Sequence, residues 1–481
     1  MAASRNSRSP DLPRRIADRL AWLLAAADPH SVLPAAPLST TPVLAVGLSG
    51  GRDSVALLAA LAAQAPARGW RLQAVHVHHG LSPHADAWAA FCGDLCARLG
   101  VPLQVHRVSL PEARPAGLEA TARAARYQVF AGLTADALIL AHHRDDQAET
   151  LLFNLLRGSG LRGLAAMPGR RLLSRPGHGP LPLLRPLLET SRAELEAWLA
   201  ADGLGWIEDE SNGDRAYARN FLRHEALPLL QSRFPAAVSL GRAAVLAGEA
   251  EDLLEELAAQ DLAKAAVGSR LQQAALAGLS SARGRNLLRC WLRRHGAPMP
   301  EARALAELWQ QLACPRPDGQ VEWRCSEWVV RLWRGTVFLD HEPLQPPSSL
   351  AEPAGPFVMP VPWAFGSIGG REVIGQGVAL ALCGEAARFR LRQGGETMQL
   401  PGRPRRPLKK LLQEADIPPW QRQRLPLLWV GQTLAWVPGI GIAADCLARA
   451  DAPGWLPEWR PAESASLSLS PLPCDDPDAP Y

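Results

Sequence analysis

Lysine is almost absent from this sequence, and its cysteines form no common metal or disulfide pattern. Only three of the 51 basic residues are lysines, and the others are arginines, whose guanidinium groups bind phosphate through paired hydrogen bonds. Such a surface tolerates phosphate-containing partners, although genome-wide base composition explains the bias more simply. The eight cysteines include no C-x-x-C pair, so we expect neither a disulfide framework nor a zinc site. Cys92 and Cys96, one helical turn apart, are interpreted as packed thiols.

The sequence also lacks an apolar run long enough to cross a membrane. Residues 20–27 form a short apolar run near the basic N-terminus, but Asp18 and Arg19 interrupt it, and eight residues are too few for a span. We interpret this segment as a surface helix of a soluble, cytoplasmic protein with no membrane partner. The net charge of +4 neither requires nor excludes a nucleic-acid partner.

A chain of 481 residues is too long for a single core and should form two to four domains. The Pro- and Gly-rich residues 158–190 are expected to be irregular, and residues 321–340 to form a β-hairpin. The sequence leaves the oligomeric state open, with a homodimer as one alternative. The predicted divisions are an N-terminal extension (1–40), a catalytic domain (41–235), a mainly helical domain (240–340), a proline-rich linker (341–369), a small C-terminal α+β domain (370–455) and a disordered tail (456–481).

Apolar strands alternate with helices between residues 41 and 157. Strands are predicted at 43–48, 72–79, 103–110 and 137–143, and helices at 55–65, 85–99, 118–133 and 146–157. This α/β alternation indicates a doubly wound, Rossmann-like parallel sheet. Ligands of such sheets bind beyond the carboxyl ends of the strands. Three polar stretches follow strands at that edge: SGGRDS (49–54), HHG (78–80) and HHRDD (142–146).

The stretch SGGRDS lacks the lysine of the phosphate loop G-x-x-x-x-G-K-[ST]. Gly50 and Gly51 permit positive φ and close approach of the backbone, and a helix follows at once. Backbone N–H groups at the helix N-terminus can therefore hold an anion without lysine. Asp53 suits such a site if Mg²⁺ bridges it to phosphate oxygens. The alternative is a plain glycine turn with Asp53 as helix cap, but the position at the ligand edge favours nucleotide binding.

The stretch HHRDDQAE concentrates ionisable side chains at the same edge. His142 and His143 end a strand, Asp145 and Asp146 open a helix, and Glu149 lies on the same helical face as Asp146. Helix capping explains one or two of these acidic residues. It does not call for two histidines and three carboxylates within eight residues. The cluster therefore predicts a cationic or amine substrate, or a metal.

Two further stretches are rich in positive charge. Arg123 and Arg126 share a helical face with Glu119, which by itself is typical of a solvated surface with one ion pair. Between residues 390 and 410 only Glu396 opposes seven basic residues, and a solvated β-turn and a nucleic-acid contact account equally well for that charge. The seven are Arg390, Arg392, Arg403, Arg405, Arg406, Lys409 and Lys410.

Five motifs, in order over residues 43–230, resemble the tRNA(Ile)-lysidine synthase family. SGGRDS alone resembles the pyrophosphate (PP) loop of the N-type ATP pyrophosphatases and leaves several enzymes open. The pattern departs from the family at His78, where Asn is usual, and at Ala120, where a second Glu is usual. The motifs that narrow the choice to one family are HVHHGLS (76–82), GLEATARAARY (117–127), AHHRDDQAETLLFNLLRGSGLRGLAAM (141–167), RPLL (185–188) and DESN…RNFLR (209–223).

The resemblance implies a ligase that uses ATP, Mg²⁺, L-lysine and a tRNA(Ile) with a CAU anticodon. Such enzymes transfer AMP to the C2 oxygen of the wobble cytidine, and the lysine ε-amine then displaces AMP, so that codon recognition changes from AUG to AUA. The implied catalytic residues are Asp53, His143, Asp146 and Glu149. The implied ATP-binding residues are Ser49, Gly50, Gly51, Arg52, Asp53, Ser54, Arg123 and Arg126, with Asp53 holding Mg²⁺ through the phosphates. Asp146, Glu149 and Arg219 would bind lysine, and Arg223, Arg403, Arg405, Arg406, Lys409 and Lys410 would bind tRNA.

Three other functions fit the sequence less well. A tRNA 2-thiolation enzyme would need a cysteine pair or an iron–sulfur triad at the ligand edge, and Cys92–Cys96 has the wrong spacing. An amidotransferase would need a glutaminase part with an N-terminal cysteine nucleophile. A non-catalytic RNA-binding protein would not need the carboxylates of Asp53, Asp146 and Glu149.

Overall fold

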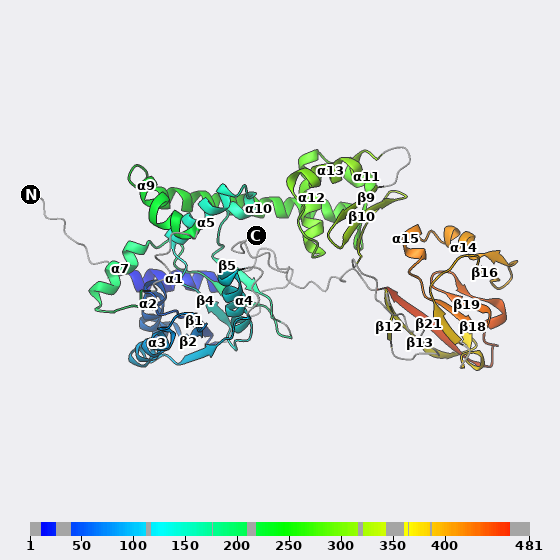
Figure 1. The fold of residues 1–481 in the computed structure, drawn as a ribbon, viewed down its shortest axis with the longest axis horizontal. Coiled ribbons are helices and arrows are strands. Elements are labelled where there is room, and N and C mark those ends of the chain that lie inside the picture. The colour runs from blue at the N-terminus through cyan, green and yellow to red at the C-terminus, as the bar shows by residue number, and fades with distance from the viewer. Residues whose placement is uncertain are drawn as a thin grey trace, which may run out of the picture. The chain divides into compact units, whose positions relative to one another are not determined.

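The structure is a computed structural model, which forms two compact units (Figure 1). One unit contains the described residues up to Leu257, and the other contains those from Ala258. The predicted linker and tail, the DESN motif and the predicted extension outside its helix lie wholly or largely outside the described residues. Those residues are 11–25, 40–111, 117–175, 177–208, 218–315, 321–342, 360–363, 365–384 and 387–461.

A six-stranded sheet in the order β3-β2-β1-β4-β6-β5 forms the centre of the first unit. All neighbouring pairs are parallel except β5 with β6. The chain runs outward from β1 to β3 and then returns to place β4 on the other side of β1, which confirms the doubly wound prediction and creates a switch point between β1 and β4. The strands are β1 (Val43–Gly47), β2 (Arg71–His78), β3 (Leu103–Arg107), β4 (Ala137–Ile139), β5 (Arg170–Leu173) and β6 (Leu181–Leu184).

The prediction that residues 158–190 are irregular was wrong. They contain the short helix α6 (Leu161–Leu164) and the β5–β6 pair, which extends the sheet beyond β4. Leu173, Leu181 and Leu183 are buried in a core cluster on one face of the sheet. The glycines and prolines between and around these four-residue strands obscured their apolar pattern in the sequence.

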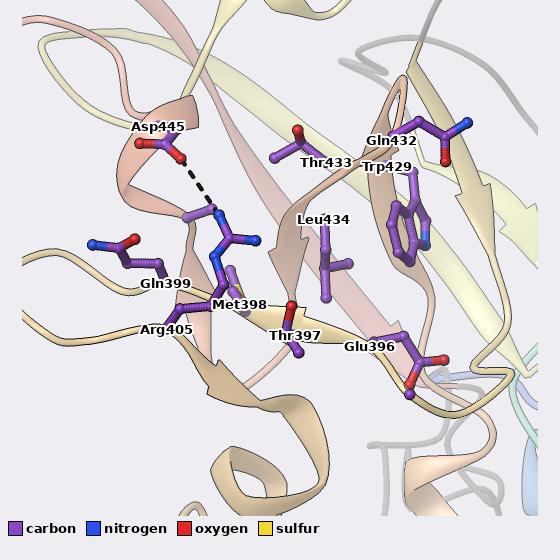
Figure 2. Close-up of a pocket in the computed structure, with 12 residues that line it drawn as sticks. Glu396, Thr397, Met398, Gln399, Arg405, Trp429, Gln432, Thr433, Leu434 and Asp445 are labelled. Atoms are coloured by element: carbon purple, nitrogen blue, oxygen red, sulfur yellow. Dashed lines mark ion pairs between the residues drawn. The ribbon is translucent and has the colours of Figure 1, made fainter.

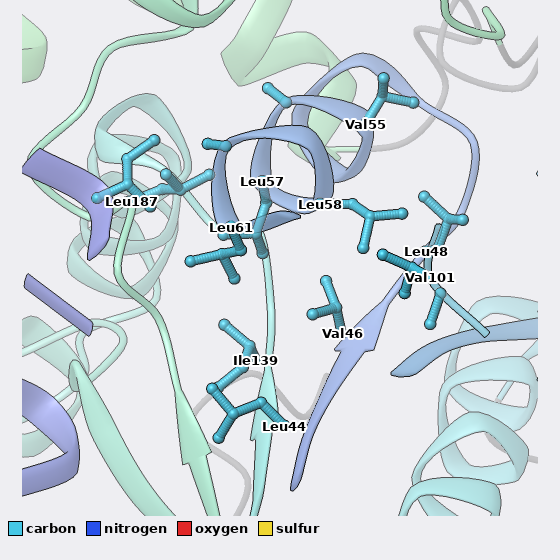
Figure 3. Close-up of a cluster of buried hydrophobic side chains, with 14 of the residues drawn as sticks. Leu44, Val46, Leu48, Val55, Leu57, Leu58, Leu61, Val101, Ile139 and Leu187 are labelled. Carbon is cyan, nitrogen blue, oxygen red and sulfur yellow. The ribbon is translucent and has the colours of Figure 1, made fainter. Parts of the chain in front are cut away.

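Helices cover both faces of the sheet, and β1 is buried on both, as is usual for a central parallel strand. Leu57, Leu58 and Leu61 of α2 lie over Val46 and Ile139 of the central strands (Figure 3). The helices around the sheet are α2 (Arg52–Arg68), α3 (Ala85–Leu99), α4 (Leu118–Ala131), α5 (Arg144–Leu156) and α7 (Arg192–Ala201).

The N-terminal helix α1 (Leu12–Ala25) belongs to this domain and is not a separate extension. Ile16, Leu20 and Leu23 are buried in the same core as α2 and β1, whereas Trp22 is exposed. The amphipathic spacing of these residues explains the burial, because one apolar face of the helix is covered and its charged face remains in solvent.

A group of helices packs against α5 at the ligand edge. They are α8 (Ala218–Phe221), a π-helical turn (Leu222–Ala226), α9 (Leu227–Gln231) and the long helix α10 (Ala236–Ala265). Ala148 of α5, Leu227 and Ala237 form a small buried cluster. This packing carries the RNFLR motif across the face of α5 that bears the acidic residues.

The second unit contains two core clusters. The first lies between α11 (Gln273–Ala277), α12 (Ser281–Arg294), α13 (Ala302–Ala313) and a five-stranded sheet of β7 (Ala266–Val267), β8 (Arg270–Gln272), β9 (Val321–Cys325), β10 (Trp328–Trp333) and β11 (Thr336–His341). The predicted hairpin is thus a three-stranded meander. Trp323 and Trp328 pack against this core.

The C-terminal part of this unit is an α+β domain larger than predicted. Strand β21 extends into the predicted tail, and β12 and β13 begin within the predicted linker. Prolines in β12 and β21, and in the sequence before β12, led to both errors, because proline usually marks linkers and disordered segments. The elements are β12 (Val361–Trp363), β13 (Gly366–Ile374), β14 (Val378–Ala379), β15 (Ala387–Arg390), β16 (Thr397–Met398), β17 (Arg406–Pro407), α14 (Leu408–Glu414), α15 (Pro419–Arg422), β18 (Leu427–Val430), β19 (Thr433–Val437), β20 (Gly441–Ile442) and β21 (Pro453–Pro461).

Replacing Gly50 should destabilise the protein more than replacing Gly69, although both have positive φ. A Cβ atom at Gly50 would lie 2.6 Å from Cδ1 of Ile207, whose backbone is held to the loop, whereas one at Gly69 would meet nothing within 4 Å. We expect Gly69→Ala to cost about 1–2 kcal/mol from backbone strain alone. Gly50→Ala should cost about 2–5 kcal/mol, because overpacking adds to the strain. Denaturant unfolding of both variants measures the difference, and equal losses would contradict this account.

Candidate active site

The SGGRDS loop after β1 is held in place by its own serines. The Ser49 N–H donates to Oγ of Ser54 at 3.2 Å, and the Ser54 hydroxyl donates to the carbonyl of Gly51 at 2.8 Å. The loop is also fixed from outside, because the Ile207 N–H donates to the Gly50 carbonyl at 2.9 Å. Sequence reasoning missed Ile207, since nothing in its own neighbourhood marks it as a support for the loop.

Helix α2 begins directly after this loop, with Gly51 at the N-cap and no side chain capping it. Asp53 lies in the first turn, so the alternative reading of Asp53 as the cap is wrong. The first N–H groups of a helix have no partner within the helix and attract anions. The geometry is therefore that of an anion-binding loop at the switch point of the sheet.

Asp53 lies between a guanidinium and an imidazole. Its carboxylate is 3.0 Å from Nε of Arg52 and 3.4 Å from Nε2 of His143. Burial raises the pKa of Asp53, but hydrogen bonding and charge interaction with His143, and then with Arg52, outweigh burial and lower this pKa well below 3.8. The carboxylate is therefore ionised at neutral pH.

His143 connects the N-termini of two helices. It is fully buried and caps α5, where its Nδ1 accepts the N–H of Asp146 at 3.4 Å while the Asp146 carboxylate accepts the N–H of His143 at 2.9 Å. Burial lowers the pKa of His143, but the carboxylates of Asp146 and Asp53, with Asp145, reverse this effect and raise it. A proton added at Nδ1 would exchange the cap bond for contact with Asp145 and Asp146, 3.8 and 3.5 Å away.

Asp145 has a second partner outside this group. Its carboxylate accepts the N–H of Arg192 at 2.9 Å, at the first turn of α7. Asp145 therefore ties α5 to α7 and lies near the histidine, whereas Asp146 and Glu149 have Arg223 as their partner.

Arg223 makes a bidentate ion pair with Glu149 and reaches Asp146 as well. Its Nε and Nη2 donate to the two Glu149 oxygens at 2.7 and 2.8 Å, and Nη2 lies 3.2 Å from Oδ1 of Asp146. Burial raises the pKa of Glu149 despite this partner. The pKa of Arg223 is raised as well, because its carboxylate partners outweigh burial. The resemblance implies a tRNA contact for Arg223, which stays a prediction; in the structure its guanidinium contacts these two carboxylates.

The other residues predicted for the first unit lie around the same edge. Arg123 donates to the Tyr127 hydroxyl at 3.2 Å, and Arg219 lies 5.8 Å from the ring of Phe153 on α5. Burial lowers the pKa of His142, and the charges of Arg185 and then of Arg123 and Arg126 lower it further. Arg123 and Arg126 are both half-buried, so they are not simply part of a solvated stripe.

Arg185 is a residue of the site to which the sequence gave no role. It is 1% exposed, and it donates to Nδ1 of His142 at 3.3 Å and to the Pro168 carbonyl at 2.8 Å. His142 is thereby held in the neutral form that carries its proton on Nε2. The RPLL motif marked Arg185, and its place at the end of a buried strand could have indicated a buried polar role.

The basic residues predicted to bind tRNA in the C-terminal domain are in the second unit and are largely exposed. Arg403, Lys409 and Lys410 lie at the surface. Arg406 pairs with Glu414 at 2.8 Å, whereas Arg405 is only loosely paired with Asp445 at 3.8 Å. The role of this stretch in tRNA binding stays a prediction.

Within the described ranges, the chain has no helix that is both long and apolar enough to cross a membrane. The same residues include no group of three or more His, Cys, Asp or Glu side chains that could hold a metal ion. Asp53 nevertheless fits the usual Mg²⁺ arrangement, in which one or two carboxylates and the phosphates of a substrate share the ion with water. A phosphate-bound Mg²⁺ is therefore compatible with the loop.

Family models match three segments of the chain. They describe a PP-loop domain (residues 28–230), a TilS substrate binding domain (271–338) and a TilS substrate C-terminal domain (387–459). The chain is also similar to several proteins named tRNA(Ile)-lysidine synthase. The one from Azoarcus is 44% identical, and the match covers 90% of this chain and 95% of that protein. The one from Nitrosomonas europaea is 41% identical, and the match covers 88% of this chain and 93% of that protein. The one from Pseudomonas putida is 43% identical, and the match covers 85% of this chain and 96% of that protein.

The chain also matches a solved structure, that of the U34-tRNA thiolase NcsA from Methanococcus maripaludis. The match covers 48% of this chain and 76% of the thiolase chain. Its identity is 18% and its TM-score is 0.38. This likeness is too low to support a conclusion about function.

The raised pKa of His143 should make its contribution to stability decline with pH. A raised folded-state pKa stabilises the protein fully below the ordinary value of 6.5, and this stabilisation is lost as the pH rises through the folded-state pKa. The difference in unfolding free energy between the parent and His143→Gln should therefore be largest in mild acid and shrink in mild alkali. Denaturant titrations across this range measure it. A difference that grows with pH would contradict the assignment.

Proposed function

Because the chain belongs to the tRNA(Ile)-lysidine synthase family, we propose that it ligates L-lysine to C2 of the wobble cytidine of a tRNA(Ile) with a CAU anticodon. The use of ATP follows from the PP-loop domain. The observation that carries the proposal is the pairing of two features at one switch point. An anion-binding loop at α2 and an acidic pair on α5, in which Glu149 is buried and Asp146 is half-buried, are joined there by the contact between Asp53 and His143.

The first half of the proposed reaction is transfer of AMP to RNA. The C2 oxygen of the cytidine attacks the α-phosphorus of ATP, an O–P bond forms, and the bond to the leaving pyrophosphate breaks. The loop amides and the N-terminus of α2 would hold the negative charge of the departing pyrophosphate. Asp53 would hold Mg²⁺ through the phosphates, and that ion would supply further stabilisation of phosphate charge. Arg123 and Arg126 would contact the nucleotide.

The second half is attack by the lysine ε-amine. The new bond joins this nitrogen to C2, the C2–O bond breaks, and the oxygen leaves with AMP. The amine must lose one proton before attack and one after it. Glu149 is suited to accept a proton, because burial raises its pKa. Asp146 and Arg219 would help to bind lysine, and the lysine ammonium would share the acidic pair with Arg223 or displace it.

Thiolation is less well supported, because the cysteine nearest the loop is buried. Cys92 is fully buried behind Gly50, and its Sγ lies 3.6 Å from Nδ1 of His76. Burial raises the pKa of this thiol to about 12, with a smaller contribution from Cys96. The thiol is therefore a packed group and not an activated nucleophile.

The remaining expectations follow from the proposed substrate. A tRNA-modifying enzyme would work in the cytoplasm, where tRNA, lysine and ATP are available. A homodimer is one alternative for the oligomeric state, but the residues placed in the reaction all come from one chain. Contact with the body of the tRNA would fall to the second unit, whose segments match the two substrate-domain models.

The central test is incorporation of labelled lysine into a tRNA(Ile) transcript with a CAU anticodon, in the presence of ATP and Mg²⁺. We expect label on this RNA and none after the wobble C is changed to U. Failure of labelling, or equal labelling of both RNAs, would refute the proposal.

Asp53→Ala should abolish tRNA-dependent pyrophosphate release. Glu149→Gln should reduce lysine incorporation on the order of 10²–10⁴-fold and reduce pyrophosphate release much less, with the exposed Glu189→Gln as control.

Replacing Arg405, Arg406, Lys409 and Lys410 by Ala should weaken tRNA binding and leave ATP chemistry at saturating tRNA intact. If all four contact phosphates, the slope of log affinity against log salt should become shallower by up to about 3.6. The change should be smaller if the ion pairs of the two arginines persist in the complex. Filter binding at several salt concentrations measures the slope. Arg460→Ala, which removes an exposed charge from the same domain, is the matched control.

A further inference from the structure

The C-terminal domain contains a cavity of about 190 Å³ that the proposed chemistry does not use (Figure 2). It lies between β16, the turn that joins β18 to β19, and the residues after β20. Arg405, which directly precedes β17, closes one side. The cavity thus borders the loop that carries the basic residues predicted to bind tRNA.

The cavity walls offer three kinds of contact. Trp429 lies toward one end, and the Arg405–Asp445 ion pair lies at the other (Figure 2). Between them are the hydroxyls of Thr397 and Thr433 with the side chain of Leu434. An aromatic ring, neutral hydrogen-bonding groups and a cation are the features with which proteins hold an unpaired nucleotide.

Two acidic side chains lie beside the cavity, but neither prevents a phosphate group from binding there. Glu396 is almost fully buried, and its carboxylate is used within its own loop, where it accepts the N–H groups of Gln393 and Gly394 at 2.6 Å each. Asp445 is 3.8 Å from Arg405, and both side chains are more than half exposed. An exposed pair at this distance is worth little, so a phosphate can compete for Arg405.

The size of the cavity limits the ligand to a small group. The cavity is smaller than the pockets of about 300–1,000 Å³ that bind whole drug-sized ligands. One planar heterocycle fits, with its sugar and phosphate outside. A base within an A-form helix cannot present its face in this way, so the nucleotide must be unpaired.

We propose that this cavity receives one unpaired nucleotide of the bound RNA, with the base against the ring of Trp429 and its phosphate beside Arg405. The identity of the RNA rests on the proposed function. The cavity then acts as a contact for RNA binding that is separate from the site of lysine ligation.

The test compares Trp429→Leu with Trp429→Phe in the full-length protein, using direct binding of the tRNA(Ile) transcript and chemical probing of each nucleotide. Loss of one stacking partner should raise the Kd by about 5- to 150-fold in Trp429→Leu, whereas the phenylalanine ring should retain most of the affinity. One unpaired nucleotide that the parent protects should become reactive in the Trp429→Leu complex. Trp459→Leu, which removes another half-buried indole of the domain, should retain both affinity and protection.

A second pair of variants does not disturb the fold, because Thr433 is exposed. Thr433→Glu should raise the Kd by placing a carboxylate near the phosphate, and the neutral Thr433→Gln should raise it less. Unchanged affinity in either Trp429→Leu or Thr433→Glu would overturn the proposal. So would equal losses in Trp429→Leu and Trp429→Phe, or altered protection only at base-paired nucleotides.

An assay of lysine incorporation distinguishes failure of the nucleotide site from failure of the proposed function. At saturating tRNA, Trp429→Leu should incorporate lysine at the parent rate, because the variant affects only binding. If the parent binds the transcript with Trp429-dependent protection but never incorporates lysine, the proposed function fails and the nucleotide site stands. If the parent incorporates lysine and Trp429 has no effect on affinity or protection, the nucleotide site fails alone.

Discussion

The contact between Asp53 and His143 is the constraint on which the rest of the active site depends. The two side chains belong to helices that follow β1 and β4, the strands on either side of the switch point. His143 is also the cap of α5, so its position fixes the first turn of the helix that carries Asp146 and Glu149. A single imidazole therefore sets the distance between the phosphate loop and the acidic pair. A shift of this side chain would therefore change the positions of the residues that serve both halves of the proposed reaction.

Each of the acidic side chains Asp53, Asp146 and Glu149 has a basic partner at this edge of the sheet. Asp53 has Arg52 and His143, while Glu149 and Asp146 have Arg223. These groups are largely removed from solvent, and a buried charge without a partner would be costly. Substrates of opposite sign can therefore enter only by exchanging partners with the protein.

The sequence predicted the central sheet and the gathering of SGGRDS with HHRDD because both depend on local rules. Apolar runs of strand length alternated with helices, and parallel strands bring the residues at their carboxyl ends together. The partners of these residues were not predictable in the same way. Arg223, Arg185 and Ile207 are brought to the edge by tertiary packing, and no spacing along the chain relates them to Glu149, His142 or Gly50. Strands β5, β6 and β21 were missed because prolines and glycines masked short apolar patterns.

The pairing of β13 with β21 determines when the C-terminal domain can form. These strands join residues 366–374 to residues 453–461, and β21 also pairs with β14. During synthesis, β13 must wait for more than 70 further residues before its partner leaves the ribosome, just as β1 must wait for β4, but the whole of the first sheet precedes β13 in the chain. The catalytic unit can thus fold while the C-terminal domain is still being made. A chain released before β21 would carry an intact PP-loop domain and an unpaired strand edge, which makes it prone to aggregation.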